Sequence, residues 1–198
     1  MNEKKILYIY GWGSNSDSRT GNILRRNLPE GYEVHTFTYN QHDAAEAMAQ
    51  IRQFISDHDI GLVIGSSLGG FLALLQTGVP RVVVNPCLAP SVELPLIGVP
   101  HDIADTYKPF EPLVRNSDLE DNCLVGGLFA SDDELLGQRY IPLFDKYYPS
   151  HIPFTGTHRL SEENIIHDLI PYLLGEFTTR MQQYDDFMYN ADNLDIYD

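Results

Sequence analysis

The stretch GLVIGSSLGGFLALL, residues 61–75, constrains the fold more than any other part of the chain. An apolar run typical of a buried strand, residues 60–65, passes without a loop into an apolar run typical of a helix, residues 68–77. Glycines and serines fill the junction, although glycine loses much conformational entropy in either element and serine competes for backbone hydrogen bonds. This composition predicts a sharp strand-to-helix turn whose backbone requires small residues.

Strands and helices alternate along most of the chain. Hydrophobic runs predict strands over residues 4–10, 32–38, 60–65, 81–85, 123–130 and 151–155. Helical periodicity predicts helices over residues 19–27, 43–57, 68–77, 134–147 and 161–177. The alternation predicts one α/β domain over residues 1–180, with a compact, mostly parallel sheet flanked by helices on both faces. In such a sheet the functional site lies at the carboxyl ends of the strands.

Residues 88–122 interrupt this alternation with five prolines and no sustained period. We expect a short excursion from the sheet that covers the site as a cap or lid, in which Leu88, Leu94, Leu96 and Ile97 shape an acyl pocket. A surface loop with a few buried anchors is an equally good interpretation.

The C-terminal end, residues 181–198, is acidic, with five aspartates and neither lysine nor arginine. We expect a disordered, solvated tail, and a segment that docks on a partner is the alternative.

Composition excludes several classes of partner. The net charge of −15 disfavours nucleic acid and anionic membrane surfaces, because phosphates would be repelled. No signal peptide and no membrane span is predicted. Cys87 and Cys123 have neither metal-ligand spacing nor a disulfide pattern, so we expect a cytoplasmic protein without a metal site. The oligomeric state is not predicted.

The junction contains the pattern G-x-S-x-G over residues 65–69, with Ser67 as the central serine. This pattern is typical of the nucleophile elbow, a strained turn that exposes a serine hydroxyl at the top of a sheet. It therefore predicts that Ser67, and not Ser66, is a nucleophile. The alternative is that small residues merely let the following helix pack closely on the sheet.

A serine nucleophile needs a histidine base, and the histidine needs a carboxylate that holds its tautomer. In this fold the expected chain order is serine, acid, histidine, each after a later strand. Asp132 and Asp133 follow the strand predicted over residues 123–130, and both are candidates for the acid. His158 is the one histidine of seven in a loop after a late strand, so we predict that it is the base.

The oxyanion that forms during acyl transfer needs backbone N–H donors. Leu68, directly after the predicted nucleophile, supplies one N–H. The loop after the first strand supplies the other, with Trp12 as the first choice and Gly11 as the second. Gly11 and Gly13 could instead be ordinary turn glycines.

The motifs ILYIYGWGSNS, GSSLGGFLA, VVVNPCLAP, SDDELL and GTHRL occur in this order. Together they resemble small bacterial YqiA/YcfP-like esterases of the α/β-hydrolase superfamily. The resemblance implies a short α/β-hydrolase that cleaves small acyl esters without a cofactor. It also implies that Asp133 is the acid, because Asp133-Glu134 aligns with an Asp-Glu pair of the family. The chain differs in having Tyr10-Gly11 where the family often has His-Gly.

The sequence thus predicts a serine hydrolase of small carboxylic esters, with a small-molecule acyl ester as its partner. An acyltransferase or thioesterase with the same triad is one alternative. A non-catalytic α/β module whose glycine-rich turn binds a small anion at the helix N-terminus is another. The natural substrate and its acyl length are not predicted.

Overall fold

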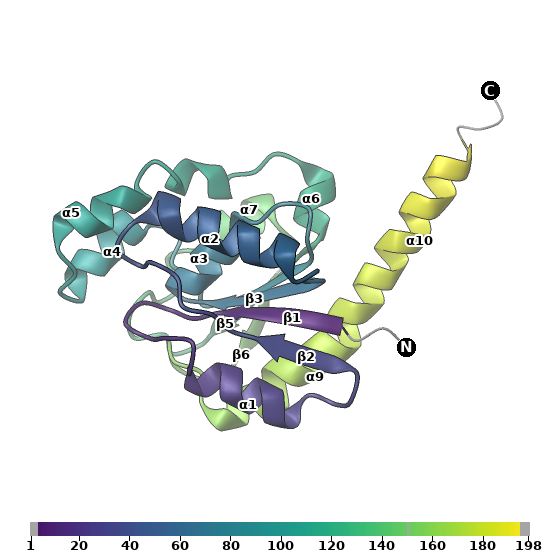
Figure 1. Ribbon diagram of the computed structural model, residues 1–198, viewed down its shortest axis with the longest axis horizontal. Coiled ribbons are helices and arrows are strands. Elements are labelled where there is room, and N and C mark those ends of the chain that lie inside the picture. Colours follow the sequence, from purple (N-terminus) through teal and green to yellow (C-terminus); the bar gives the residue numbers. More distant parts are fainter. Residues whose placement is uncertain (1–3, 150, 195–198) are drawn as a thin grey trace.

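The computed structural model describes residues 4–149 and 151–194 (Figure 1). Six strands form one sheet in the order β2-β1-β3-β4-β5-β6, and every neighbouring pair is parallel. All six predicted strands are confirmed, although β2 is shorter than expected. The strands are β1 (Lys4–Ile9), β2 (Tyr32–His35), β3 (Leu62–Ser66), β4 (Arg81–Val84), β5 (Val125–Ala130) and β6 (Ile152–Phe154).

Apolar runs form the central strands because helices cover both of their faces. Ile6, Leu7 and Ile9 of β1 are fully buried, as are Val82 and Val83 of β4. A parallel sheet buried on both faces requires continuous apolar runs rather than alternation. The predicted α/β architecture is therefore confirmed.

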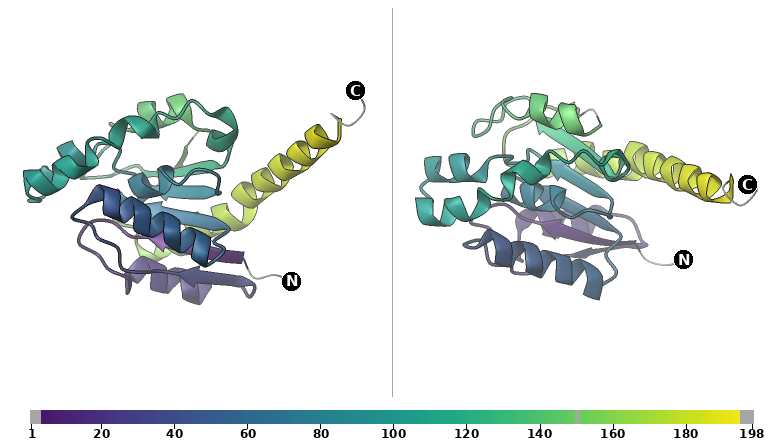
Figure 2. Two further views of the ribbon diagram at one scale, coloured as in Figure 1. Left: turned by 45° about the horizontal axis from the view of Figure 1, so that its top comes forward. Right: turned by 90° about the horizontal axis from the view of Figure 1, so that it is seen from above.

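The helices form two layers around the sheet (Figures 1 and 2). Helix α1 (Arg19–Asn27) lies on one face with α9 (Ile170–Tyr172), and α2 (Ala44–Asp57) and α3 (Leu68–Leu74) cover the other. Two successive glycines of β5 allow aromatic side chains to pack closely against the strand. A Cβ at Gly126 would meet Tyr172, and one at Gly127 would meet Phe144 of α7 (Ile141–Tyr147).

The helix predicted over residues 134–147 is wrong for its first half. The helix begins only at Ile141, and residues 131–140 form a series of turns. Gly137 has a φ of 56°, which is incompatible with a right-handed helix, and Pro142 occupies the first turn of α7. The turns leave Asp133 in a loop rather than at a helix N-terminus.

The chain after residue 161 is helical for longer than predicted. It comprises α8 (Glu162–Asn164), the π-helical η3 (Ile165–Leu169), α9, the π-helical η4 (Leu173–Phe177) and α10 (Thr178–Leu194). The expected disordered tail is wrong for residues 181–194, which lie in α10, and residues 195–198 lie outside the described residues.

Helix α10 projects away from the body of the molecule (Figures 1 and 2). The turns of η4 lead directly into α10, so this helix extends one that is already formed. The Arg180 side chain at its start donates to the backbone oxygen of Val125 at 2.8 Å. Among the described residues, no helix is long and apolar enough to cross a membrane.

Residues 88–122 form short helices rather than an irregular loop. They contain α4 (Pro90–Leu96), α5 (His101–Ala104), α6 (Leu119–Cys123) and two 3₁₀ turns, η1 (Asp105–Tyr107) and η2 (Glu111–Val114). The Tyr107 hydroxyl donates to the backbone oxygen of Gln41 at 2.6 Å, and the N–H of Ala44 donates to the Thr106 hydroxyl at 3.2 Å. These bonds fix the excursion beside α2.

Candidate active site

Ser67 joins β3 to α3 with φ 54° and ψ −120°, a conformation that side-chain-bearing residues rarely adopt. Its N–H donates to the Val84 oxygen at 3.1 Å, and its oxygen accepts N–H groups from Phe71 and Cys87 at 3.1 and 3.0 Å. Such strain persists only where the surroundings impose it, and it concentrates at functional sites. The predicted sharp turn at Ser67 is present.

Two glycines explain the unusual composition of the junction. A Cβ at Gly69 would lie 2.1 Å from the Ile9 oxygen, and one at Gly65 would lie 2.2 Å from the Gly69 oxygen. No side chain fits at these distances from rigid backbone. Close packing of α3 on the sheet, the alternative explanation for the small residues, is therefore present at the same turn, and it is compatible with a nucleophilic Ser67.

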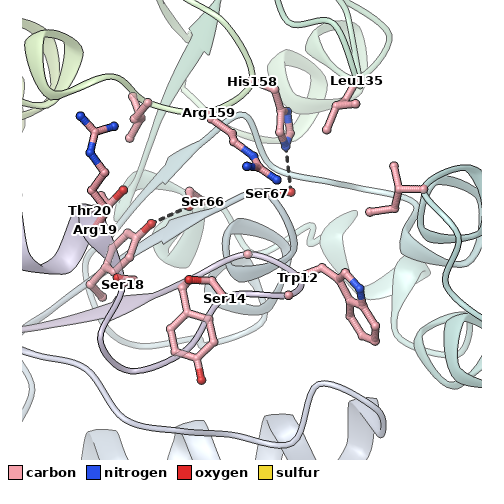
Figure 3. A pocket seen from close by; sticks show the side chains of 16 residues that line it. Trp12, Ser14, Ser18, Arg19, Thr20, Ser66, Ser67, Leu135, His158 and Arg159 are labelled. Carbon is pink, nitrogen blue, oxygen red and sulfur yellow. Dashed lines mark hydrogen bonds between the residues drawn. The ribbon is translucent and has the colours of Figure 1, made fainter.

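A hydrogen-bonded chain connects Ser67, His158 and Asp133. The Nε2 atom of His158 lies 2.9 Å from the Ser67 Oγ, a bond drawn in Figure 3. The Nδ1 atom of His158 lies 2.9 Å from the Asp133 Oδ2. All three residues follow the carboxyl ends of strands, so the topology of the sheet brings together segments far apart in sequence.

The environment of Asp133 favours its ionised form. Burial alone would raise the pKa of Asp133, but hydrogen bonds from His158 and from the N–H groups of Leu136 and Leu135 hold the pKa below its ordinary value. Asp132 instead is exposed and accepts the Ser131 hydroxyl at 2.8 Å. The structure therefore places Asp133, and not Asp132, against His158.

Two further side chains fix the loop that carries His158, and the sequence analysis assigned neither of them a role. The Glu134 carboxylate accepts the N–H of His158 at 2.9 Å, and this bond lowers the pKa of Glu134. The buried Asn85 amide donates to the oxygens of Thr157 and His158 at 3.3 and 3.1 Å. A polar residue at the end of the buried run RVVVN is the signal that could have identified Asn85.

The residues predicted to bind an oxyanion through their N–H groups lie near Ser67: Leu68 follows it directly, and Gly11 and Trp12 line the same cavity. Leu68 is the first residue of α3, and no hydrogen bond from its N–H or from that of Trp12 occurs within the described part of the chain. Gly11 lies close to Ser67, since a Cβ at Gly11 would be 3.1 Å from the Ser67 Cβ. The Gln41 amide donates to the Gly11 oxygen at 3.0 Å and so fixes this loop.

Other nucleophilic groups nearby are held in different roles. The Ser66 Oγ lies 2.7 Å from the hydroxyl of Tyr8. Cys87 is buried, and this burial raises the pKa of its thiol far above the ordinary value, which disfavours the reactive thiolate. Ser67 is thus the hydroxyl that contacts a histidine in this site.

A cavity of about 420 Å³ opens above Ser67 and His158. Of the four residues predicted to shape an acyl pocket, only Ile97 lines it. The prediction is wrong for Leu88 and Leu94, which are buried in the core, and for Leu96, which is 71% exposed. The excursion therefore contributes one corner of the cavity, because α4 packs its apolar side inward against the domain.

The model of an uncharacterised protein family, UPF0227, matches residues 5–107, slightly more than half of the 198-residue chain. No curated protein matches the sequence.

Several solved structures share the fold. Est1E from Butyrivibrio proteoclasticus with bound ferulic acid has a TM-score of 0.65 at 14% identity, over 87% of this chain and 89% of that one. A monoacylglycerol lipase from Paleococcus ferrophilus has a TM-score of 0.68 at 13% identity, over 90% and 96%. The type II thioesterase BorB from the borrelidin biosynthetic cluster has a TM-score of 0.62 at 14% identity, over 88% and 91%. At these identities the likeness establishes the α/β-hydrolase fold.

Proposed function

The chain belongs to UPF0227, an uncharacterised protein family, and from the geometry around Ser67 we propose that it is a serine hydrolase of small carboxylic esters. The observation that supports this proposal is the continuous hydrogen-bonded chain from Ser67 through His158 to Asp133. It joins a strained serine, a base and an ionised acid at the carboxyl edge of the sheet, where α/β enzymes bind their substrates.

In the proposed reaction the Ser67 Oγ attacks the ester carbonyl while His158 Nε2 takes the hydroxyl proton. The N–H groups of Leu68 and Trp12, or Gly11 in place of Trp12, stabilise the tetrahedral oxyanion. His158 then protonates the departing alkoxide, which leaves an acyl group on Ser67. Water, deprotonated by His158, attacks this acyl-enzyme, and His158 returns the proton to the Ser67 Oγ as the acid is released. The Asp133 carboxylate holds the imidazole tautomer and stabilises the imidazolium in both halves of the reaction.

A non-catalytic anion-binding module is less well supported. Binding an anion at a helix N-terminus requires neither a histidine 2.9 Å from the serine hydroxyl nor a carboxylate behind that histidine. A thioesterase or acyltransferase would use the same acyl-enzyme, and product analysis with thioesters and acceptor alcohols distinguishes these activities from ester hydrolysis.

The test is hydrolysis of 4-nitrophenyl esters of graded acyl length by the wild type and by two neighbouring serine variants. Ser67→Ala should lower kcat by about 10³-fold or more, since nucleophile and base act as a unit. Ser66→Ala should keep turnover within about tenfold of the wild type, because it removes only a hydrogen bond to Tyr8. Equal loss in both variants, or an active Ser67→Ala protein, would contradict the proposal.

A further inference from the structure

The cavity above Ser67 differs in charge from the rest of the molecule. The chain carries 28 acidic and 13 basic residues, yet the lining of this cavity contains two arginines and no acidic residue. Arg159 directly follows the proposed base, and Arg19 is the first residue of α1. A cationic site in an otherwise acidic protein selects for a negatively charged ligand.

The two guanidinium groups are available for binding. Within the described residues no hydrogen bond or ion pair holds the Arg159 guanidinium, and Figure 3 shows its side chain pointing toward Ser67. Arg19 lies 3.8 Å from Glu162, and its side chain is 67% exposed, so this pair is weak. Neither arginine would therefore have to break a strong internal interaction to bind a ligand anion.

The remaining side chains divide the cavity into two parts. Figure 3 shows Ser18, Arg19 and Thr20 on one side of Ser67, and Trp12 and Leu135 on the other. The first part offers hydroxyl and guanidinium donors, and the second offers apolar surface. A substrate whose ester lies over Ser67 would thus extend one end toward donors and the other toward apolar groups.

We propose that the substrate is an ester with an anionic group, a carboxylate or a phosphate, on one side of the scissile bond and an apolar group on the other, with Arg159 as the main anion contact. This inference rests on the proposed hydrolase function and adds the substrate class. Guanidinium binds either anion through paired N–H donors, so the chemistry is shared between the two.

The kinetic test compares the neutral ester phenyl butyrate with esters that add one anionic group to it: 4-carboxyphenyl butyrate, 4-phosphoryloxyphenyl butyrate and, for the acyl side, mono-phenyl glutarate. We expect kcat/KM about tenfold higher for at least one charged ester than for phenyl butyrate, as is typical of one charge-assisted contact. Arg159→Met should reduce this ratio to about one. Arg26→Met is the matched control, because Arg26 lies on α1 outside the cavity, and it should leave the ratio unchanged.

A binding measurement keeps the test independent of turnover. Trp12 is the single tryptophan of the chain and lines the cavity, so its fluorescence reports occupancy. Benzoate or phenyl phosphate should change this fluorescence in the Ser67→Ala protein, benzamide should not, and Arg159→Met should abolish the response. Comparing the two anions identifies which one is preferred.

Failure of this inference is distinguishable from failure of the proposed function. If every ester is hydrolysed with equal kcat/KM and no anion affects the fluorescence, the anionic substrate is refuted while the hydrolase stands. If no ester is hydrolysed but the anions bind through Arg159, the cationic site is supported and the hydrolase proposal fails. Absence of both responses refutes both.

Discussion

At the scale of single residues, two adjacent carboxylates in one turn have different environments. Asp133 is buried and bonded to His158, whereas Asp132 is exposed and bonded to Ser131. The depressed pKa of Asp133 means that its carboxylate is ionised at and above its ordinary value near pH 4, and is neutralised only as the pH falls below the folded-state pKa. Protonation of Asp133 therefore does not limit activity between pH 5 and 8.

The pair Asp133→Asn and Asp132→Asn tests this difference. We expect Asp133→Asn to lower kcat by about 10³- to 10⁴-fold with little change in KM, since the amide cannot hold the tautomer that accepts a proton. Asp132→Asn should retain activity within about threefold, as is usual for an exposed residue. Single-turnover kinetics with a chromogenic ester measures both. A large loss in Asp132→Asn beside a nearly normal Asp133→Asn would reverse the assignment.

The sequence pointed to residues that lie together in the structure where chemistry restricts residue type and chain order. Ser67, His158 and the pair Asp132 or Asp133 follow from the elbow pattern and from the strand ends, and the structure brings Ser67, His158 and Asp133 together. Asn85 and Arg159 could not be assigned in this way. Their proximity to the site depends on which loops meet above the sheet, and no local pattern in the sequence indicates which loops do so.

At the scale of elements, a buried ion pair anchors β4 at the amino end of the sheet, opposite the candidate active site. Arg81 is fully buried, and its guanidinium donates to the Asp121 carboxylate at 2.8 Å and to the Asp121 backbone oxygen at 2.9 Å. The same carboxylate accepts the N–H of Gly78 at 2.7 Å. This network joins β4 to α6.

Breaking the pair should destabilise the fold without altering the chemistry. Asp121→Ala should lower the free energy of unfolding by about 3–5 kcal/mol, because it leaves a buried guanidinium without a counter-charge. Glu120→Ala, at an exposed position of the same helix, should change it by less than about 0.5 kcal/mol. Urea unfolding measures both variants, and esterase assays well below the melting temperature should give wild-type kcat. A loss under 1 kcal/mol in Asp121→Ala would contradict this account.

Element prediction was accurate for strands and poorer for segments controlled by single turn residues. Continuous apolar runs define the central buried strands, and the shorter edge strands β2 and β6 were found as well. The segment before α7 was missed because Gly137 and Pro142 break a helical pattern that otherwise continues. Apolar residue type in the excursion indicates burial but does not indicate which part of the molecule buries the side chain. Leu88 and Leu94 were therefore assigned to the cavity, although they lie in the core.

At the scale of the whole molecule, the family and the α/β-hydrolase fold predicted from the motifs are confirmed. The acidic C-terminal end was predicted to be disordered, but α10 extends to Leu194. Composition predicts solvation, and a solvated segment can still be helical where a packed helix leads into it. A net charge of −15 for the whole chain is compatible with a cavity lined by two arginines, because the charge of a site depends only on the few side chains that line it.

The central claim is that this fold activates Ser67 as a nucleophile, and covalent labelling with a fluorophosphonate tests it most directly. Mass spectrometry of the labelled, digested protein should find one phosphonyl adduct per chain, on the peptide that contains Ser67. The His158→Ala variant should remain folded and lose the label, since no base then activates the hydroxyl. A wild-type protein that stays unlabelled, or that carries the adduct on Ser66 or another residue, would contradict the account.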